Sequence, residues 1–209
     1  MINEKLLTEV CMRVAGDYVP FPSSRFRGTY LVSHTKENQG SILKKCRATA
    51  RRTREPVILS NNVTAITGYP GASAWTSELL RMGFGALRIV TFDVHGPANT
   101  LTEMQNLVAF LKARALNLLR LTAWDIQQPR AFITLVSVLL KEYPELRVYN
   151  VPGFPLDPDE EAHGSQNEPL GRRAEAYAKE IARIHAYHAK GDLVDMETVL
   201  DYMDRRDRT

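Results

Sequence analysis

Short runs rich in β-branched and other apolar residues alternate with longer runs whose apolar residues recur at helical spacing. The short runs, each typical of a strand, cover residues 28–35, 56–62, 86–93, 118–123 and 146–151. The longer runs, each typical of a helix, cover residues 41–53, 73–82, 100–115 and 129–140. Neighbouring parallel strands need a long crossover rather than a tight turn. The pattern therefore predicts an α/β fold, a three-layer Rossmann-like sandwich with a mainly parallel sheet of about five strands.

The segments on either side of this alternating pattern differ from it. Residues 2–15 show a loose helical pattern that Gly16 can end. Residues 152–169 are polar and rich in proline, which predicts a loop, and two further helices are expected at about 171–190 and 195–204. We therefore expect an accessory helix and linker in 1–27, a Rossmann-like core in 28–155, and a loop with C-terminal helices in 156–209.

Two local signals mark the starts of core helices. Thr100 and Glu103 have the spacing of a capping box, in which the threonine hydroxyl accepts from the Glu103 amide and the carboxylate reaches back to the Thr100 amide. Pro129 stands where a first helical residue is expected, and proline is favoured there because that amide has no helical partner. Both helices are thus predicted to begin directly after a strand and its loop.

Composition narrows the class of protein without indicating its chemistry. The 209 residues are 44% hydrophobic and 24% charged, with a mean hydropathy of -0.26, as in soluble globular proteins. The net charge of +3 comes from 27 basic and 24 acidic residues, too small an excess to indicate a dedicated nucleic-acid binder. The charged N-terminus does not resemble a signal peptide, and no apolar run approaches the length of about 18 residues that a membrane span needs. We expect a cytoplasmic protein without a membrane span.

Three further groups of residues contain types that often bind metals, nucleic acids or lipids or form disulfides, but an ordinary surface or core role is favoured for each. Cys11 and Cys46 lie in predicted helices without a CxxC motif, so we expect reduced thiols. His185, His188 and Asp192 share a helical face, but surface roles are favoured and no metal site is expected. A basic run suggests RNA or acidic lipid, but without interleaved aromatic residues a solvated face is favoured. This run comprises Lys44, Lys45, Arg47, Arg51, Arg52 and Arg54.

The carboxyl ends of parallel strands are where an open α/β sheet binds its ligands, and the free amides of helix N-termini there favour an anionic guest. We assign Asp93 as the candidate catalytic residue, since it could act as a general base, orient a ribose hydroxyl or hold a metal, with a structural cap on its loop as the alternative. An ion pair between Asp125 and Arg130 is the alternative to a ligand role for those two. Neither phosphate-binding glycine motif is present, and the loop at 68–72 is interpreted as a turn. The candidate ligand-binding residues are Ser60, Asn61, Asn99, Thr100, Asp125 and Arg130.

An ordered series of short motifs over residues 28–155 resembles the YdcF/SanA-type family of bacterial domains of unknown function. The matching elements are Arg47-Ala48, Ile58-Leu59-Ser60, Gly83-Phe84, Ile89, Asn99-Thr100 with Glu103, Leu121-Thr122-Ala123 and Pro129-Arg130-Ala131. The resemblance implies a Rossmann-like domain with nucleotide-type ligands, S-adenosylmethionine among them, and a link to the cell envelope. Family members often carry an N-terminal membrane anchor, which this sequence lacks.

The chain departs from the family pattern at four places. Asn61 and Asn62 replace the usual glycines after Ser60, and Gly71 stands where a glutamate usually opens the helix. Asp93 replaces the usual glutamate and Gln127 the usual histidine, each after an apparent insertion. The resemblance carries a site role over to Asp93, Asn99, Thr100 and Arg130.

Two functions follow as hypotheses. The first is binding of a small anionic or nucleotide-like ligand at the carboxyl edge of the sheet, with transferase or hydrolase chemistry. The alternative is a non-catalytic interaction module that has lost the family's site and acts through its helical tail or as a homo-oligomer.

Overall fold

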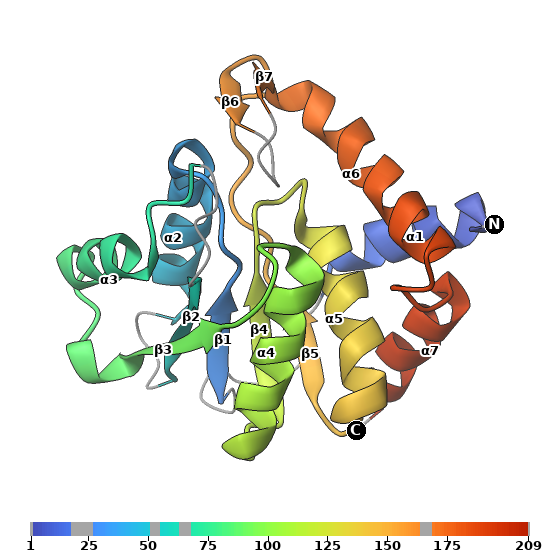
Figure 1. Ribbon diagram of the computed structural model, residues 1–209, viewed down its shortest axis with the longest axis horizontal. Coiled ribbons are helices and arrows are strands. Elements are labelled where there is room, and N and C mark those ends of the chain that lie inside the picture. The colour runs from blue at the N-terminus through green and yellow to red at the C-terminus, as the bar shows by residue number, and fades with distance from the viewer. Residues whose placement is uncertain (1, 18–26, 51–54, 63–67, 164–168, 209) are drawn as a thin grey trace.

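A parallel sheet forms the centre of the molecule. A computed structural model describes residues 2–17, 27–50, 55–62, 68–163 and 169–208 (Figure 1). The sheet has five strands, all parallel, in the order β3-β2-β1-β4-β5. These are β1 (Gly28–Leu31), β2 (Val57–Asn62), β3 (Ile89–Val94), β4 (Leu118–Thr122) and β5 (Arg147–Asn150). The predicted Rossmann-like α/β sandwich is confirmed.

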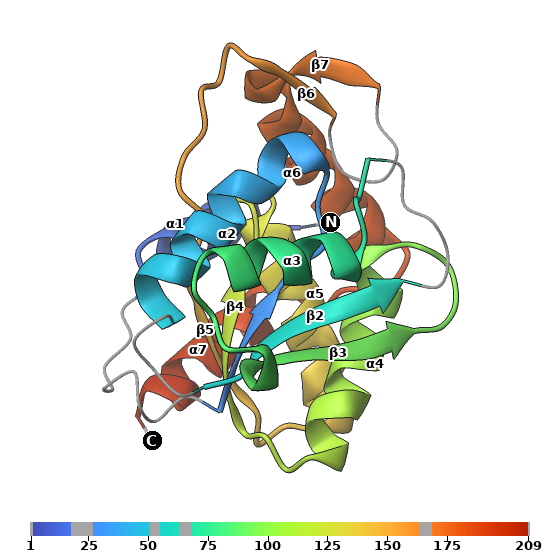
Figure 2. The same ribbon diagram turned by 90° about the vertical axis from the view of Figure 1, so that its left-hand side faces the viewer.

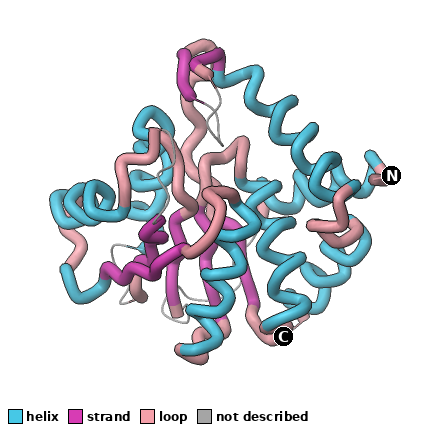
Figure 3. Tube along the Cα trace, in the orientation of Figure 1, coloured by secondary structure: helices cyan, strands magenta, loops and turns pink. Residues whose placement is uncertain are grey.

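Helices cover both faces of this sheet, so that the strands lie between two helical layers (Figure 3). Helices α2 (Lys36–Ala50) and α3 (Ala72–Arg81) lie on one face, in front of the strands in Figure 2. Helices α4 (Thr100–Ala113) and α5 (Gln128–Glu142) lie on the other, and the short 3-10 helix η2 (Ala86–Arg88) leads into β3.

Successive strand residues point to opposite faces, and the two halves of the core follow this alternation. Tyr30 and Ile58 are buried with the α4 and α5 side chains, whereas Leu31 and Leu59 are buried with those of α2 and α3. Because both faces are covered, the central strands β1 and β4 are buried at every position, whereas burial alternates toward the end of the edge strand β3.

The helices outside the alternating pattern pack on the α4–α5 face and share its core. They are α1 (Glu4–Ala15), α6 (Arg173–Ala189) and α7 (Met196–Asp207). Leu7 and Val10 of α1, Ile184 of α6 and Tyr202 of α7 are all buried in that core. Helix α1 ends at Gly16, as predicted. None of the helices in the described residues has the length and hydrophobicity needed to cross a membrane.

Several predicted boundaries were wrong. The strand predicted at 28–35 ends at Leu31, and the strand predicted at 86–93 begins at Ile89. Helix α2 begins at Lys36, earlier than the predicted start at Ser41, because the Thr35 carbonyl already accepts from the amide of Gln39 at 2.9 Å. The predicted loop contains β6 (Glu161–His163), which pairs antiparallel with β7 (Leu170–Arg172). Such short strands gain their hydrogen bonds from a partner strand, which the local sequence does not reveal. The end of the predicted helix at 51–53, and Arg51, Arg52 and Arg54 of the basic run, lie outside the described residues.

Candidate functional site

The buried carboxyl group of Glu103 gathers three hydroxyl groups at the carboxyl ends of β1 and β2. Its Oε1 accepts from the Ser33 amide at 3.2 Å, from Ser33 Oγ at 3.0 Å and from Ser60 Oγ at 3.1 Å. The Tyr30 hydroxyl also donates to this oxygen, and the two serine hydroxyls are hydrogen-bonded to each other. Strand alternation places Tyr30 and Ser60 on the α4 face of the sheet, beside Glu103.

Burial controls the protonation of this cluster. Loss of hydration raises the pKa of Glu103, although hydrogen bonds from Tyr30, Ser33 and Ser60 act in the opposite direction. Burial and the neighbouring Glu103 also raise the pKa of Tyr30. A carboxyl group whose pKa is moved upward can exchange a proton nearer to neutral pH than an exposed glutamate. The arrangement therefore provides an acid–base group in contact with two serine hydroxyls.

The prediction of a capping box at Thr100 and Glu103 was wrong. Helix α4 begins at Thr100, but its N-cap is Asn99, whose side chain accepts from the Thr102 amide at 2.9 Å. Asparagine is among the most favoured N-cap residues because its side-chain oxygen pairs with a free amide of the first turn. The Glu103 side chain is therefore free to turn toward the sheet.

Arg130, at the start of α5, is completely buried and is paired with Glu180 of α6. Its Nη1 donates to Thr100 Oγ1 at 2.6 Å, and its Nη2 donates to Glu180 Oε1 at 3.4 Å. Arg183, one turn along α6, also donates to that carboxylate, at 2.5 Å. The alternative of an Arg130–Asp125 ion pair was therefore wrong, since the acidic partner comes from the C-terminal tail.

The loops after β1 and β4 diverge at the topological switch point of the sheet, and His34 and Trp124 meet there edge to face with ring centroids 5.0 Å apart. The Thr35 amide donates to His34 Nδ1 at 2.8 Å, so the ring proton of neutral His34 lies on Nε2. That Nε2, Trp124 Nε1 and Gln127 Oε1 are buried and have no hydrogen-bond partner among the described residues. Native proteins seldom leave such groups unpaired, so this edge can accept additional polar partners.

Stability is expected to fall as the pH drops from 6.5 to about 4, because burial lowers the pKa of His34 from 6.5 to about 4. The neutral imidazole stabilises the folded state above pH 6.5, and this contribution is lost as the folded protein is forced to take up a proton. The pKa difference corresponds to about 3 kcal/mol. Urea unfolding of wild type and His34→Gln at a series of pH values measures it. An unchanged pH dependence in the variant would contradict this assignment.

The structure separates Asp93 from the Glu103 cluster. Phe92 and Val94 are buried against α4, so Asp93 between them points to the opposite face of the sheet. There it is exposed and accepts from Asn61 Nδ2 at 2.8 Å. The residues proposed for ligand binding are likewise divided: Ser60 lies in the Glu103 cluster, Asn99 and Thr100 lie at the start of α4, and Asp125 lines a cavity beside α1.

Four residues of the site were missed from the sequence, beginning with Glu103 itself, which was assigned only a helix-capping role. Ser33 lies two residues beyond the end of β1, and a polar residue near a strand end is a usable signal for a site at a sheet edge. Tyr30 lies within a strand and resembles an ordinary core residue, and Glu180 lies 50 residues beyond Arg130 on a helix outside the alternating pattern. No local pattern identifies either of those two.

The remaining candidates have ordinary partners. His188 Nε2 lies 2.8 Å from Asp195 Oδ1, and His185 Nε2 lies 3.2 Å from Glu4 Oε1. In the described ranges, His, Cys, Asp and Glu side chains form no group of three or more that could hold a metal ion. Cys11 and Cys46 are both free thiols, as expected.

No protein-family model matches this chain, and no curated protein matches it in sequence. The site must therefore be interpreted from its own residues.

Proposed function

We propose that the protein binds a small anionic or nucleotide-like ligand at the carboxyl edge of its sheet, between the Glu103 cluster and Arg130. The observation that carries this proposal is the buried Glu103 carboxyl group, which contacts the hydroxyls of Tyr30, Ser33 and Ser60. Structural carboxylates seldom occupy such a position without a charged partner, whereas ligand and catalytic sites often contain groups with perturbed pKa values.

Each part of such a ligand has a complementary group at this edge. A ribose or sugar hydroxyl can donate to Glu103 and accept from Ser33, and the Ser33 side chain is only partly buried. A phosphate or carboxylate can pair with Arg130 if it displaces Glu180, since a guanidinium binds either anion through paired hydrogen bonds. Transferase or hydrolase chemistry would use Glu103 as general acid or base toward the bound group.

The resemblance to the YdcF/SanA-type family adds support, because Asn99, Thr100, Glu103 and Arg130 are among the residues that carry it. S-adenosylmethionine is therefore included among the ligands to be tested. The family assignment itself is part of the proposal.

A thermal-shift panel of nucleoside phosphates, S-adenosylmethionine and sugar phosphates tests the proposal. A ligand at about a hundred times its Kd is expected to stabilise the folded state by about 2.7 kcal/mol, which raises the Tm by about 5–10 °C. Glu103→Gln should abolish that shift, whereas Glu142→Gln, at an exposed position at the end of α5, should retain it. A panel without any shift, or an equal shift in both variants, would overturn the proposal.

The second candidate is a non-catalytic interaction module, which the neutralised Arg130 favours. The guanidinium that would bind an anion is completely buried and already paired with Glu180. A carboxylate of the helical tail therefore occupies the position that a ligand anion would take. Light scattering on the full chain distinguishes the two functions. A stable dimer together with a silent ligand panel would support the module, and a monomer that responds to a ligand would contradict it.

A further inference from the structure

A second hollow of about 590 Å³ lies on the α1 side of the molecule, beyond the β4 and β5 ends of the sheet. Its walls come from α1, α2, the beginning of α5, α6 and the loops after β4 and β5. None of the residues that line it belongs to the Glu103 cluster, and Arg130 does not line it. A volume of this size falls within the range of about 300–1,000 Å³ that is typical of small-molecule sites.

Most of this cavity is apolar, and its walls are fixed in place. Met12, Ile126, Pro129, Pro152 and Pro155 line it, and Tyr177 lies at its α6 side. The loop wall is held by a hydrogen bond from the Gly153 amide to the Ala123 carbonyl at 2.8 Å and by one from Ser41 Oγ to the Phe154 carbonyl at 2.5 Å. A preformed cavity of this kind binds a ligand without first ordering its own walls.

The rim exposes large apolar side chains. Met12 is 71% exposed and Tyr177 52%, and Phe154, in the same loop as the lining residues Gly153 and Pro155, is 41% exposed. Scattered exposed hydrophobic residues are common, but a group of them around a hollow is a feature of binding sites.

The charged side chains of Lys45 and Asp125 line the cavity, and one carboxylate oxygen of the second has no described hydrogen-bond partner. The Lys45 ammonium lies over the Phe154 ring, 5.0 Å from its centroid, which is an attractive contact for a cation. Asp125 Oδ1 is buried and has no hydrogen-bond partner among the described residues. Burial raises the pKa of Asp125, although backbone hydrogen bonds at Ile126 and Asp125 and the charge of Arg173 act in the opposite direction. The unpaired group at this cavity is therefore a hydrogen-bond acceptor, the Oδ1 atom of Asp125.

We propose that this cavity is a binding site for a small, mainly apolar molecule that carries a hydrogen-bond-donating ammonium group for Asp125. The apolar body of the ligand lies against the proline, methionine and tyrosine side chains, and its ammonium group pairs with the carboxylate. Asp125 Oδ1 is itself buried, so the contact requires the side chain to turn this oxygen toward the ligand. The site is independent of the function proposed for the Glu103 cluster.

Three naphthalene probes that differ in the charge of the substituent on the ring test the ligand class. We expect the cation of 1-naphthylmethylamine to bind more tightly than uncharged 1-methylnaphthalene, and the carboxylate anion 1-naphthaleneacetate to bind most weakly. A hydrogen bond to a charged group contributes about 1.5–3 kcal/mol, so the amine should gain at least about tenfold in Kd over the uncharged probe. Asp125→Asn should remove that preference while leaving the uncharged probe unaffected. Glu142→Gln, at an exposed position at the end of α5, should bind all three probes as the wild type does.

A matched pair of variants tests the location. Ala15 is the last residue of α1 and lines the cavity, whereas Ala113 is the exposed last residue of α4 and does not line it. Ala15→Phe fills the hollow and should weaken binding of the amine at least about tenfold, since each good apolar contact it removes carries about 1 kcal/mol or more. Ala113→Phe should bind as the wild type does.

Cys11 provides a reporter that needs no substitution. It lies on the cavity wall and is half-buried, whereas Cys46 is fully buried and its pKa is raised to about 12, chiefly by burial. An alkylating reagent should therefore modify Cys11 first, and bound 1-naphthylmethylamine should slow that reaction. Absence of saturable binding at millimolar probe, equal binding by Ala15→Phe, or unprotected Cys11 would each overturn the proposal.

Discussion

Glu180→Ala is expected to lower the free energy of unfolding by about 3–5 kcal/mol, because it leaves a completely buried guanidinium without its carboxylate. Among the contacts that Arg130 would keep is the neutral Thr100 Oγ1, which lies 2.6 Å from its Nη1. Glu180 is itself 2% exposed, so water cannot readily replace it. Urea unfolding followed by circular dichroism measures the loss.

Two further variants separate the ion pair from general damage to α6. Glu175→Ala removes an exposed carboxylate from the same helix and should change the free energy of unfolding by less than about 0.5 kcal/mol. The double variant Arg130→Met with Glu180→Leu removes both charges, and it should recover most of the stability that Glu180→Ala loses. If the double variant is as unstable as Glu180→Ala, the loss comes from packing rather than from the stranded charge.

The same variants bear on the proposed function. If a ligand anion must displace Glu180 to reach Arg130, Glu180→Gln should bind that ligand more tightly than the wild type while unfolding more readily. Opposite changes in affinity and stability would not be expected if Arg130 served packing alone. Weaker binding in Glu180→Gln would indicate that the tail carboxylate is part of the ligand site.

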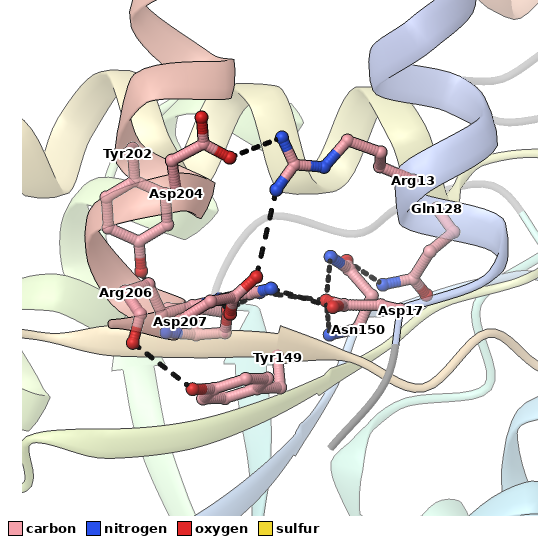
Figure 4. A network of polar contacts seen from close by, with 10 residues as sticks. Arg13, Asp17, Gln128, Tyr149, Asn150, Tyr202, Asp204, Arg206 and Asp207 are labelled. Atoms are coloured by element: carbon pink, nitrogen blue, oxygen red, sulfur yellow. Dashed lines mark hydrogen bonds and ion pairs between the residues drawn. The ribbon is translucent and has the colours of Figure 1, made fainter. Parts of the chain in front are cut away.

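Asp17→Ala is expected to cost about 3 kcal/mol, because Asp17 is the buried partner of Arg206. Arg206 Nη1 and Nη2 donate to the two Asp17 oxygens at 2.8 and 2.7 Å, and its guanidinium lies over the Tyr149 ring, 4.0 Å from the centroid (Figure 4). Burial alone would lower the pKa of Arg206, but Asp17 and Asp207 outweigh it and raise the pKa. The expected loss is at the low end for a buried pair because Asp207 remains.

This pair joins three distant parts of the chain. Asp17 follows α1, Arg206 lies on α7, and Asp17 Oδ2 also accepts from the Asn150 amide of β5 at 2.8 Å. Hydrogen exchange at the Asn150 amide should therefore accelerate in Asp17→Ala, together with the loss in urea unfolding. Asp201→Ala, at an exposed position on α7, should alter neither measurement. Equal effects from both variants would refute the specific role of the Asp17–Arg206 pair.

Most of the α/β core was predictable because its cause is local. Residues 57–59 form a continuous apolar run because both faces of β2 are covered, and the helix after β3 begins at Thr100 as expected. The β6–β7 pair was missed because two three-residue strands depend on each other rather than on their own sequence. The capping box was misassigned because Asn99 and Thr100 are both suitable N-caps, and only the position of the sheet determines where the Glu103 side chain goes.

Ser60 and Asn61 show what determined the composition of the site. They are adjacent in β2, yet their side chains lie on opposite faces of the sheet. Ser60 is hydrogen-bonded to Glu103, and Asn61 is hydrogen-bonded to Asp93. Arg130 was correctly placed at the sheet edge, but its partner came from α6 rather than from the nearby Asp125. Pairings across a sheet or from a distant helix depend on how the layers pack.

The sequence by itself determined the fold class, the parallel sheet and most of its helices, because hydrophobic periodicity and helix signals act over a few residues. Only the tertiary structure decided the face on which each polar side chain lies, the burial that raises the pKa of Glu103, and the covering of Arg130 by the tail. The physical reason is that burial and ion pairing are set by segments far apart in the chain, such as Arg130 and Glu180. Those distant contacts determine which polar residues at the sheet edge lie together in the candidate site.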